Sequence, residues 1–256
     1  MSRQVYLDAM GITAWVRRDA GDEARAANVS AEASESLVRH ADESRHTETR
    51  VEPLDSGFRR NDGREEPTTS QLNWDELQAR VSVCTRCAEL AATRTQTVFG
   101  VGNHNAKWMV IGEAPGAEED RQGEPFVGRA GQLLNNMLKA IGLERETVFI
   151  ANMIKCRPPG NRDPHPEEIA NCSDYLRRQV ELVSPKVILA VGRISAQNLL
   201  KTGEPLARLR GKMHRLGDIP LVVTYHPAYL LRTPSDKAKA WADLRFAREV
   251  AEGRCS

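Results

Sequence analysis

The strongest constraint on the fold is an alternation of short apolar runs with helical stretches over residues 107–252. The apolar runs are Lys107–Ile111, Thr147–Ala151, Lys186–Val191 and Pro220–Tyr225. The helical stretches are Arg129–Ile141, Pro166–Val183, Arg193–Lys201 and a last one from about Pro234 to Glu252, capped by Thr233. Strands that alternate with helices form a parallel sheet with helices on both faces, and continuous apolar strands fit burial on both faces. The sequence therefore predicts an α/β three-layer sandwich with a central, mainly parallel four-stranded sheet flanked by helices.

The folded domain is expected to begin near residue 70 and to cover residues 71–256. Asn73 followed by Glu76 is a helix-capping pattern that marks its first helix. Residues 19–70 are dominated by Ala, Glu, Ser, Arg and Asp. Such a segment buries too little apolar surface to offset the entropy lost on ordering. It is predicted to be a disordered linker.

Residues 1–18 form a short amphipathic peptide with aromatic side chains at Tyr6 and Trp15. The peptide is either a frayed terminal helix or a docking motif. It resembles the N-terminal peptide of the psi subunit of bacterial DNA polymerase III, which contacts the clamp loader. That resemblance implies a replisome contact through residues 4–18.

Charge and hydropathy narrow the class of protein. The formal net charge is +1, and a modestly basic remainder follows the acidic residues 1–71, which permits a polyanionic partner. No apolar run approaches the roughly 18 residues of a membrane span, and the N-terminus lacks the apolar core of a signal peptide. We expect a cytoplasmic monomer that does not bind membranes.

Each apolar run ends in residues that suit a binding site. The first run ends in Gly112-Glu113-Ala114-Pro115-Gly116, a tight turn that lets a ligand approach the backbone closely. The others end in Asn152, in Gly192-Arg193 and in His226. Ligands of open α/β sheets bind at the carboxyl ends of the strands. A carboxylate, a carboxamide and an imidazole are therefore expected to meet on one rim.

Asn152 and Phe126 are candidates for recognising a planar base. A side-chain amide that follows a buried strand can pair with the edge of a nucleobase through one donor and one acceptor. Phe126 lies in a Gly- and Pro-rich segment, where an aromatic face suits base stacking. The structural alternatives are a strand-end Asn that caps a turn and a Phe that anchors a loop on the core.

The segment that begins at His226 combines a polar group with apolar and basic ones. His226 can donate to a carbonyl oxygen that gains negative charge in a transition state. Tyr229, Leu230 and Arg232 are candidate DNA-binding residues, because apolar wedges separate bases while arginine binds phosphate. The alternatives are a structural histidine and an amphipathic turn that covers the core.

Four of the five cysteines suggest a metal centre. Cys84 and Cys87 form a CxxC pair, and Cys156 and Cys172 lie further along the chain. In a cytosolic protein, clustered thiols bind metal more often than they form disulfides. Their spacing alone does not separate zinc from an iron–sulfur cluster. Cys255 stands apart in the C-terminal tail.

Residues 72–250 resemble the family-4 uracil-DNA glycosylases, the iron–sulfur type of bacteria and archaea. The motifs that carry the resemblance are Gly112–Asp120, Pro125–Leu134, Asn152 with Lys155–Pro159, and His226–Arg232. Their order, spacing and placement at strand ends all agree. The resemblance implies the uracil-DNA glycosylase fold and base excision repair of single- or double-stranded DNA, and hence a nucleoid-associated protein. It does not cover the N-terminal extension.

The resemblance also implies roles for single residues. Uracil flipped out of DNA would stack on Phe126 and be read by the amide of Asn152. The backbone at Gly112, Glu113 and Ala114 would hold a uracil carbonyl, and His226 would stabilise the uracil anion. Four cysteines, Cys84, Cys87, Cys156 and Cys172, would bind a [4Fe–4S] cluster.

The sequence departs from the family-1 uracil-DNA glycosylases at the position of the general base. The family-1 enzymes carry an aspartate where this sequence has Ala114; family-4 members lack it too, which leaves Glu113 as a candidate. Two other functions remain open: excision of hypoxanthine or xanthine, and a uracil-DNA trap that binds covalently through a histidine. The amide of Asn152 favours uracil, and the loop at Pro158–Pro166 lacks the basic insertion of the covalent relatives, so His165 is expected to be solvated.

Overall fold

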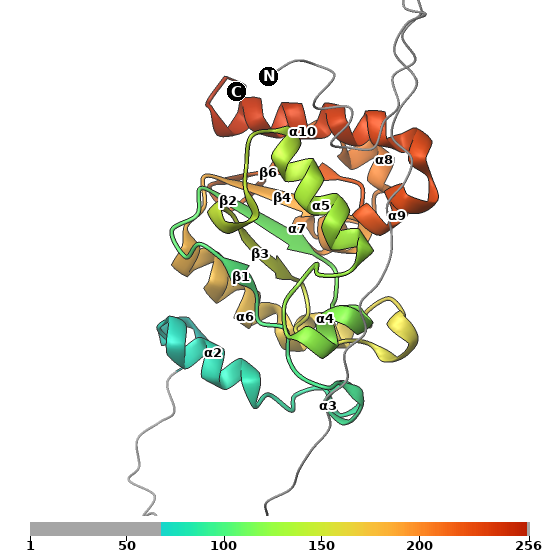
Figure 1. Cartoon of the computed structure of the whole chain (residues 1–256). Helices are drawn as coiled ribbons and strands as arrows, with labels where there is room; N and C mark the ends of the chain where they lie inside the picture. The colour runs from blue at the N-terminus through green and yellow to red at the C-terminus, as the bar shows by residue number, and fades with distance from the viewer. Residues whose placement is uncertain (1–67, 255–256) are drawn as a thin grey trace, which may run out of the picture. The chain divides into compact units, whose positions relative to one another are not determined.

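The computed structural model describes residues 68–254 (Figure 1). The expectations for the peptide at residues 1–18 and for the linker up to residue 67 lie outside the described residues. The described part begins with a short 3-10 turn, η1 (Thr69–Gln71), in which the side chain of Thr69 is buried.

The centre of the fold is a six-stranded sheet in the order β1-β3-β2-β4-β6-β5. Its strands are β1 (Val101–Gly102), β2 (Trp108–Gly112), β3 (Phe149–Asn152), β4 (Val187–Val191), β5 (Met213–Leu216) and β6 (Ile219–Thr224). The four predicted strands are the inner ones, and they pair in parallel. The two edge strands, β1 and β5, are antiparallel to their neighbours. The α/β sandwich is confirmed, and only the strand count was too low.

Five α-helices of the described residues occupy predicted stretches, and four short ones were not predicted. They are α2 (Trp74–Ser82), α3 (Ala88–Thr93), α4 (Ala117–Gln122), α5 (Arg129–Ala140), α6 (Pro166–Val183), α7 (Arg193–Leu200), α8 (Leu206–Leu209), α9 (Pro227–Arg232) and α10 (Lys237–Ala251), with 3-10 turns η2 (Arg145–Thr147), η3 (Pro159–Asn161) and η4 (Pro234–Asp236). The helix expected from Pro234 onward is divided into η4 and α10. None of the helices in residues 68–254 is long and apolar enough to cross a membrane.

Alternate residues of the central strands face opposite layers of helices. Met109 and Ile111 of β2 pack with α2 and α6, whereas Trp108 and Val110 pack with α5 and α10. Figure 1 shows α5 and α10 on one side of the sheet and α6 on the other. Because both faces are covered, the inner strands are apolar except at their last residues, where Asn152 ends β3 and Thr224 ends β6. The strand ends are thus the place for polar groups.

The first helix begins as predicted. Asn73 accepts a hydrogen bond from the backbone of Glu76 at 3.0 Å, and the Glu76 carboxylate accepts from the backbone of Asn73 at 2.8 Å. This reciprocal cap satisfies backbone donors that the first helical turn leaves free. The helix ends at Ser82, so Cys84 and Cys87 lie in the turn between α2 and α3.

Candidate active site

A cleft of about 730 Å³ opens where β2, β3, β4 and β6 end. Glu113, Asn152 and His226 all line it, although they follow three different strands and are distant in sequence. Other residues that line the cleft include Ala114, Glu119, Phe126, Asp163, Arg193, Tyr225, Ala228, Tyr229 and Arg232. The structure thus brings the expected carboxylate, carboxamide and imidazole to a single rim.

Asn152 presents an unpaired acceptor in this cleft. Its side chain is 2 % exposed, and its Oδ1 is the one buried side-chain oxygen or nitrogen in residues 68–254 without a hydrogen-bond partner. A Cβ added at Gly112 would collide with this oxygen and lie 2.6 Å from a ring carbon of Phe126. Only glycine therefore fits between the amide and the ring. A buried acceptor without a partner costs free energy, which a ligand with an N–H donor would recover.

Phe126 is held in place by the loop around it. Its φ of 55° is unusual for a bulky residue, which needs surrounding contacts to persist. Glu119 accepts hydrogen bonds from the backbone of Val127 at 3.0 Å and of Gly128 at 3.1 Å. Arg145 donates to the carbonyl oxygen of Phe126 at 3.2 Å. The ring is both part of the core and a wall of the cleft.

His226 is oriented by the start of α9. Its Nδ1 accepts from the backbone N–H of Ala228 at 3.2 Å, so the neutral ring carries its proton on Nε2. Its ring centroid lies 5.6 Å from that of Phe126. Burial, followed by the charge of Arg232, lowers the pKa of His226 to about 4. The side chain is therefore a neutral hydrogen-bond donor at pH 7.

Glu113 is a carboxyl group with a displaced pKa. Burial raises the pKa of Glu113 to about 7, and the charge of Asp163 adds to the rise, while Arg193 opposes it. Arg193 binds Asp163 at 2.7 Å across the same end of the cleft. Near pH 7 Glu113 can thus give or accept a proton, which suits a general acid or base.

The segment after His226 differs in part from the expectation. Leu230 is fully buried against a layer that includes α5 and α10. The prediction that it is an exposed wedge was therefore wrong. The exposed apolar neighbour is Leu231, at 36 %. Arg232 is exposed beside it. The short helix α9 turns one leucine inward and the next outward because successive helical residues lie about 100° apart.

Tyr229 belongs to an aromatic stack at the edge of the cleft. Its ring lies parallel to that of Tyr225, with centroids 5.0 Å apart. The guanidinium of Arg210 covers Tyr225 at 4.2 Å, and the hydroxyl of Tyr229 donates to Asp236 at 2.6 Å. The stack gives the rim a rigid aromatic surface.

The four predicted cysteines surround one small cavity. Cys156 follows β3, Cys172 lies on α6, and both are buried, whereas Cys84 and Cys87 are half-buried. Arg94 donates to Cys156 Sγ at 2.9 Å and to the carbonyl oxygen of Cys84. Four sulfur ligands around one enclosed space fit either tetrahedral zinc or an iron–sulfur cluster.

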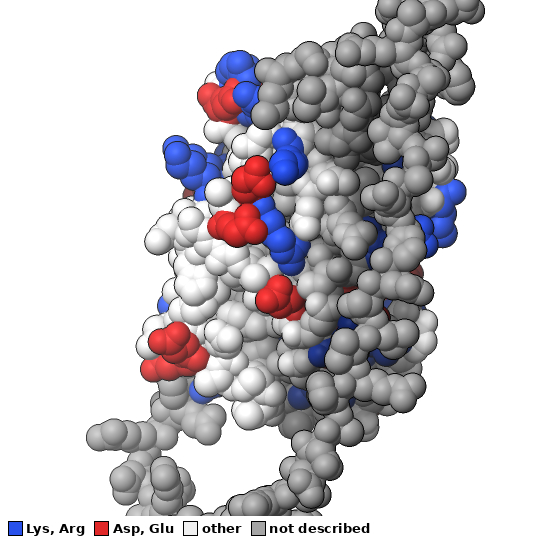
Figure 2. Space-filling view, viewed as in Figure 1, with Lys and Arg blue, Asp and Glu red and all other residues white. Residues whose placement is uncertain are grey.

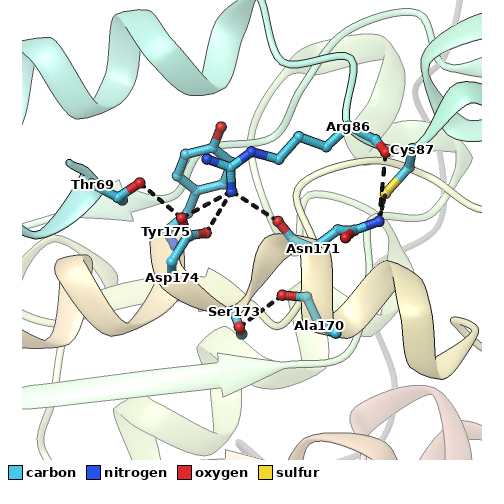
Figure 3. Close-up of polar contacts among 8 residues, drawn as sticks. All are labelled: Thr69, Arg86, Cys87, Ala170, Asn171, Ser173, Asp174 and Tyr175. Carbon is cyan, nitrogen blue, oxygen red and sulfur yellow. Dashed lines mark hydrogen bonds and ion pairs between the residues drawn. The ribbon is translucent and has the colours of Figure 1, made fainter. Parts of the chain in front are cut away.

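A network that shares Arg86, Asn171 and Tyr175 with the wall of this cavity fixes the CxxC turn to α6 (Figure 3). Arg86 donates to Asp174 at 2.8 Å and to the backbone of Asn171 at 3.1 Å, and its guanidinium lies 4.3 Å from the Tyr175 ring centroid. Thr69 donates to the same Asp174 at 2.7 Å. The start of the described chain, the CxxC turn and α6 are thereby joined.

A second group with metal-ligating atoms lies nearby but is already paired. Glu89, His165 and Glu168 bring their ligand atoms within 4.8 Å of one another. Arg162 binds Glu89 at 2.8 Å and Glu168 at 2.7 Å, which supplies the positive charge that the two carboxylates need. His165 is exposed, as expected. The trio is best described as an ion-pair network.

Charges of both signs are interspersed on the described residues visible in Figure 2. The modest basic excess of the sequence therefore does not gather into a single patch on the part of this face that is drawn in white, blue and red. The arginines Arg193 and Arg232 line the cleft itself.

Sequence reasoning missed two supporting residues of the cleft, Asp163 and Glu119, and placed Arg193 at a strand end without giving it a role. Asp163 and Arg193 flank Glu113, and Glu119 holds the loop after Phe126. The place of Arg193 directly after a strand and a glycine was a usable signal. Asp163 and Glu119 gave none, because their partners come from other elements of the fold.

Comparisons with known proteins agree with this geometry. The sequence model of the uracil DNA glycosylase superfamily matches residues 99–245. A type-4 uracil-DNA glycosylase of Archaeoglobus fulgidus is 42% identical over 184 residues, which are 69% of this chain and 92% of that protein. One of Thermotoga maritima is 44% identical over 166 residues, 64% of this chain and 85% of its own. A type-5 enzyme of Pyrobaculum aerophilum is 30% identical, over 61% of this chain and 83% of its own. This chain belongs to the uracil-DNA glycosylase superfamily, with the type-4 enzymes among its relatives.

Proposed function

We propose that this protein excises uracil from DNA by hydrolysing the bond between the base and deoxyribose, which leaves an abasic site. The observation that carries the proposal is the buried, unpartnered Oδ1 of Asn152 beside Gly112 and Phe126. The family match and the names of the type-4 relatives support the same reaction.

Uracil is recognised by its edge and by its face. The N3–H of the base donates to Asn152 Oδ1, and the amide nitrogen donates to O4. The base stacks on Phe126. Flipping the nucleotide out of the duplex costs a few kcal/mol of lost stacking and pairing, and these contacts offset that cost.

Bond cleavage depends on stabilising the leaving group. When the C1′–N1 bond breaks, its electron pair leaves with uracil, which becomes an anion. The neutral ring of His226 donates from Nε2 to uracil O2, where negative charge develops. Water adds to C1′ and loses a proton, for which Glu113 is the acceptor because its pKa of about 7 leaves part of it ionised at neutral pH. Ala114 carries no group that could take this role.

The cysteine centre serves the fold. Cys84, Cys87, Cys156 and Cys172 would hold a [4Fe–4S] cluster, which would cross-link the CxxC turn, the segment after β3 and α6. The enclosed cavity and the arginine at Cys156 suit a thiolate-ligated group with negative charge.

DNA is gripped at the rim of the cleft. Leu231 and Arg232 are the exposed apolar and basic groups of α9, and they replace the predicted pair of Leu230 and Arg232. Leu231 fills the space that the flipped nucleotide vacates, and Arg232 binds phosphate. Tyr229 contributes the aromatic edge. The protein acts as a monomer in the cytoplasm, and residues 1–70 are not needed for excision.

The test uses anaerobically purified protein and an end-labelled oligonucleotide that contains one uracil. Alkali breaks the strand at abasic sites, so cleavage at uracil alone is the expected result without added metal. A matched oligonucleotide with thymine in place of uracil is the control. Intact DNA together with a band that resists denaturation would instead indicate a covalent trap. Intact DNA without such a band would refute both enzyme and trap.

A further inference from the structure

Lys155 is a buried cation whose hydrogen-bond partners are neutral. Its side chain is 1 % exposed, and its Nζ donates to the carbonyl oxygen of Asn152 at 3.0 Å and to Gln179 Oε1 at 2.6 Å. Among residues 68–254, no carboxylate forms an ion pair with Lys155. The ionisable groups that act on its charge are the thiols of Cys172 and Cys156. Its two hydrogen bonds to neutral oxygens are the contacts that fix the position of the ammonium group.

The hydrogen bond to the Asn152 carbonyl oxygen gives the buried lysine a structural role. Asn152 is the last residue of β3, so its carbonyl group lies where the ladder with β2 ends. The chain then turns, and the backbone N–H groups of Met153 and Ile154 donate to Gly112 and Glu113. Lys155 Nζ reaches back across this turn to the Asn152 carbonyl. The turn that carries the base-reading amide is thus closed by one side chain.

Gln179 extends the arrangement to α6. Its Oε1 accepts from Lys155, and its Nε2 donates to the carbonyl oxygen of Phe99 at 2.9 Å. Gln179 is completely buried and lies on the same helix as Cys172. Lys155 also contributes to the wall of the four-cysteine cavity. The helix that holds a cysteine ligand is therefore connected to the carbonyl group of Asn152 through two buried side chains.

We propose that Lys155 and Gln179 are positioning residues that tie helix α6 to the Asn152 turn and thereby set the place from which the Asn152 amide reads uracil. The inference rests on the proposed function, because it concerns the fit of that amide to the base. The two side chains touch neither base nor sugar. They act through Asn152 alone, and this distinguishes positioning from a general contribution to stability.

A double-mutant cycle between Lys155→Met and Asn152→Ala tests the proposal. Methionine keeps the length of the lysine side chain and removes the donor. Single-turnover excision by Lys155→Met should fall about 10- to 100-fold, the cost of a misplaced group, and affinity for free uracil should fall with it. The double variant should excise as slowly as Asn152→Ala, because residues that act as a unit are not additive. Multiplied losses in the double variant would refute the positioning role.

Gln179 provides a second route if Lys155→Met does not fold. Gln179→Leu removes the acceptor for Lys155 and should slow excision in the same direction. The matched control is Arg178→Met on the same helix, which removes a bond to the Leu72 carbonyl and should change stability only. Equal rates for Gln179→Leu and the unaltered protein would overturn the proposal.

Two further readouts separate the possible failures. Visible absorbance per protein reports whether Lys155→Met still holds its metal centre, and it should be unchanged. Loss of absorbance in step with activity would assign Lys155 to the cysteine centre and refute positioning of Asn152. If the unaltered protein excises no uracil, the proposed function fails and this inference fails with it; if it excises uracil and Lys155→Met does so equally fast, only the inference fails.

Discussion

The cleft and the cysteine centre differ in how far their polar groups are paired by hydrogen bonds. In the cleft, Asn152 Oδ1 is buried without a partner in the described chain, and Glu113 is a half-buried carboxyl group beside another acid. Around the cysteines, Arg86 and Arg94 each make several hydrogen bonds to side chains and carbonyl oxygens. In the cleft, an unpaired group gains a hydrogen bond only when a ligand binds. Around the cysteines, the hydrogen bonds are already made and stabilise the folded chain.

The pKa values follow the same division. Burial raises the pKa of Glu113 to about 7 and lowers that of His226 to about 4, so both groups favour their neutral forms. In the second region the hydrogen bond from Arg86 helps to hold the pKa of Asp174 below its usual value against the effect of burial. Neutral groups suit a site that binds an uncharged base, whereas charged groups suit an ion pair such as Arg86–Asp174, which holds two segments of the chain together.

The largest effect is expected at the unpartnered amide. Asn152→Asp should reduce uracil excision by about 10³-fold or more, because a carboxylate offers no donor to O4 and repels it. Cytosine excision should become detectable, since a carboxylate can accept from the cytosine amino group. Single-turnover assays on matched oligonucleotides measure both rates. Asn198→Asp, which alters an amide on α7 bonded to its own helix, should leave the rate unchanged. An unchanged base preference in Asn152→Asp would contradict the assigned role.

The next effect concerns the imidazole. His226→Asn keeps an acceptor that can cap α9 but removes the Nε2 donor. The rate of bond cleavage should fall about 10²- to 10³-fold, as for other lost donors to a developing anion, while the melting temperature stays close to that of the unaltered protein. A loss below 10-fold would show that the leaving group is stabilised elsewhere.

A smaller effect, on stability alone, is expected at the cysteine centre. Arg86→Met should lower the free energy of unfolding by about 2 kcal/mol, because it leaves Asp174 without its cation and removes the contact with Tyr175. Excision per folded, metal-loaded molecule should not change. The control is Arg121→Met, which breaks an exposed pair with Glu118 and should cost under about 0.5 kcal/mol in denaturant titration. A matching loss of catalytic rate in Arg86→Met would remove the distinction between the regions.

The smallest effect depends on pH. The folded pKa of Glu113, about 7, lies above its ordinary value of 4.5, so ionisation opposes folding as pH rises through this window and costs nothing below it. Glu113→Gln should therefore be more stable than the unaltered protein at pH 8, by about 1 kcal/mol after allowance for its partial exposure, and equally stable at pH 4.5. Thermal melts at both values measure the difference. A constant difference would show that the raised pKa is not its cause.

Much of the fold could be predicted because its signals are local. The four inner strands are continuous apolar runs, and α5, α6 and α7 begin and end within about a residue of the predicted positions. The edge strand β5 was missed because its residues, Met213–Leu216, are mostly polar or half-exposed and form a strand by pairing with β6. The short helix α4 was not predicted, because its residues, Ala117–Gln122, are almost all polar and show no apolar periodicity.

The candidate site was predictable for a related reason. Parallel strands place their carboxyl ends together, so Glu113, Asn152 and His226 could be assigned to one rim from their positions after apolar runs. Leu230 was misplaced because the inward or outward direction of a residue in a short helix depends on what the helix packs against. Its neighbour Leu231 has the same side chain and the opposite exposure.

By itself, the sequence determined the order of the four inner strands and of the long helices between them, the residues at the strand ends and the four cysteines, because periodicity and spacing are properties of neighbours along the chain. The tertiary structure decided the rest: the unpaired oxygen of Asn152, the displaced pKa values of Glu113 and His226, and the link from Lys155 to Gln179. Burial and partners from distant elements set these properties, and neither exists until the chain has folded.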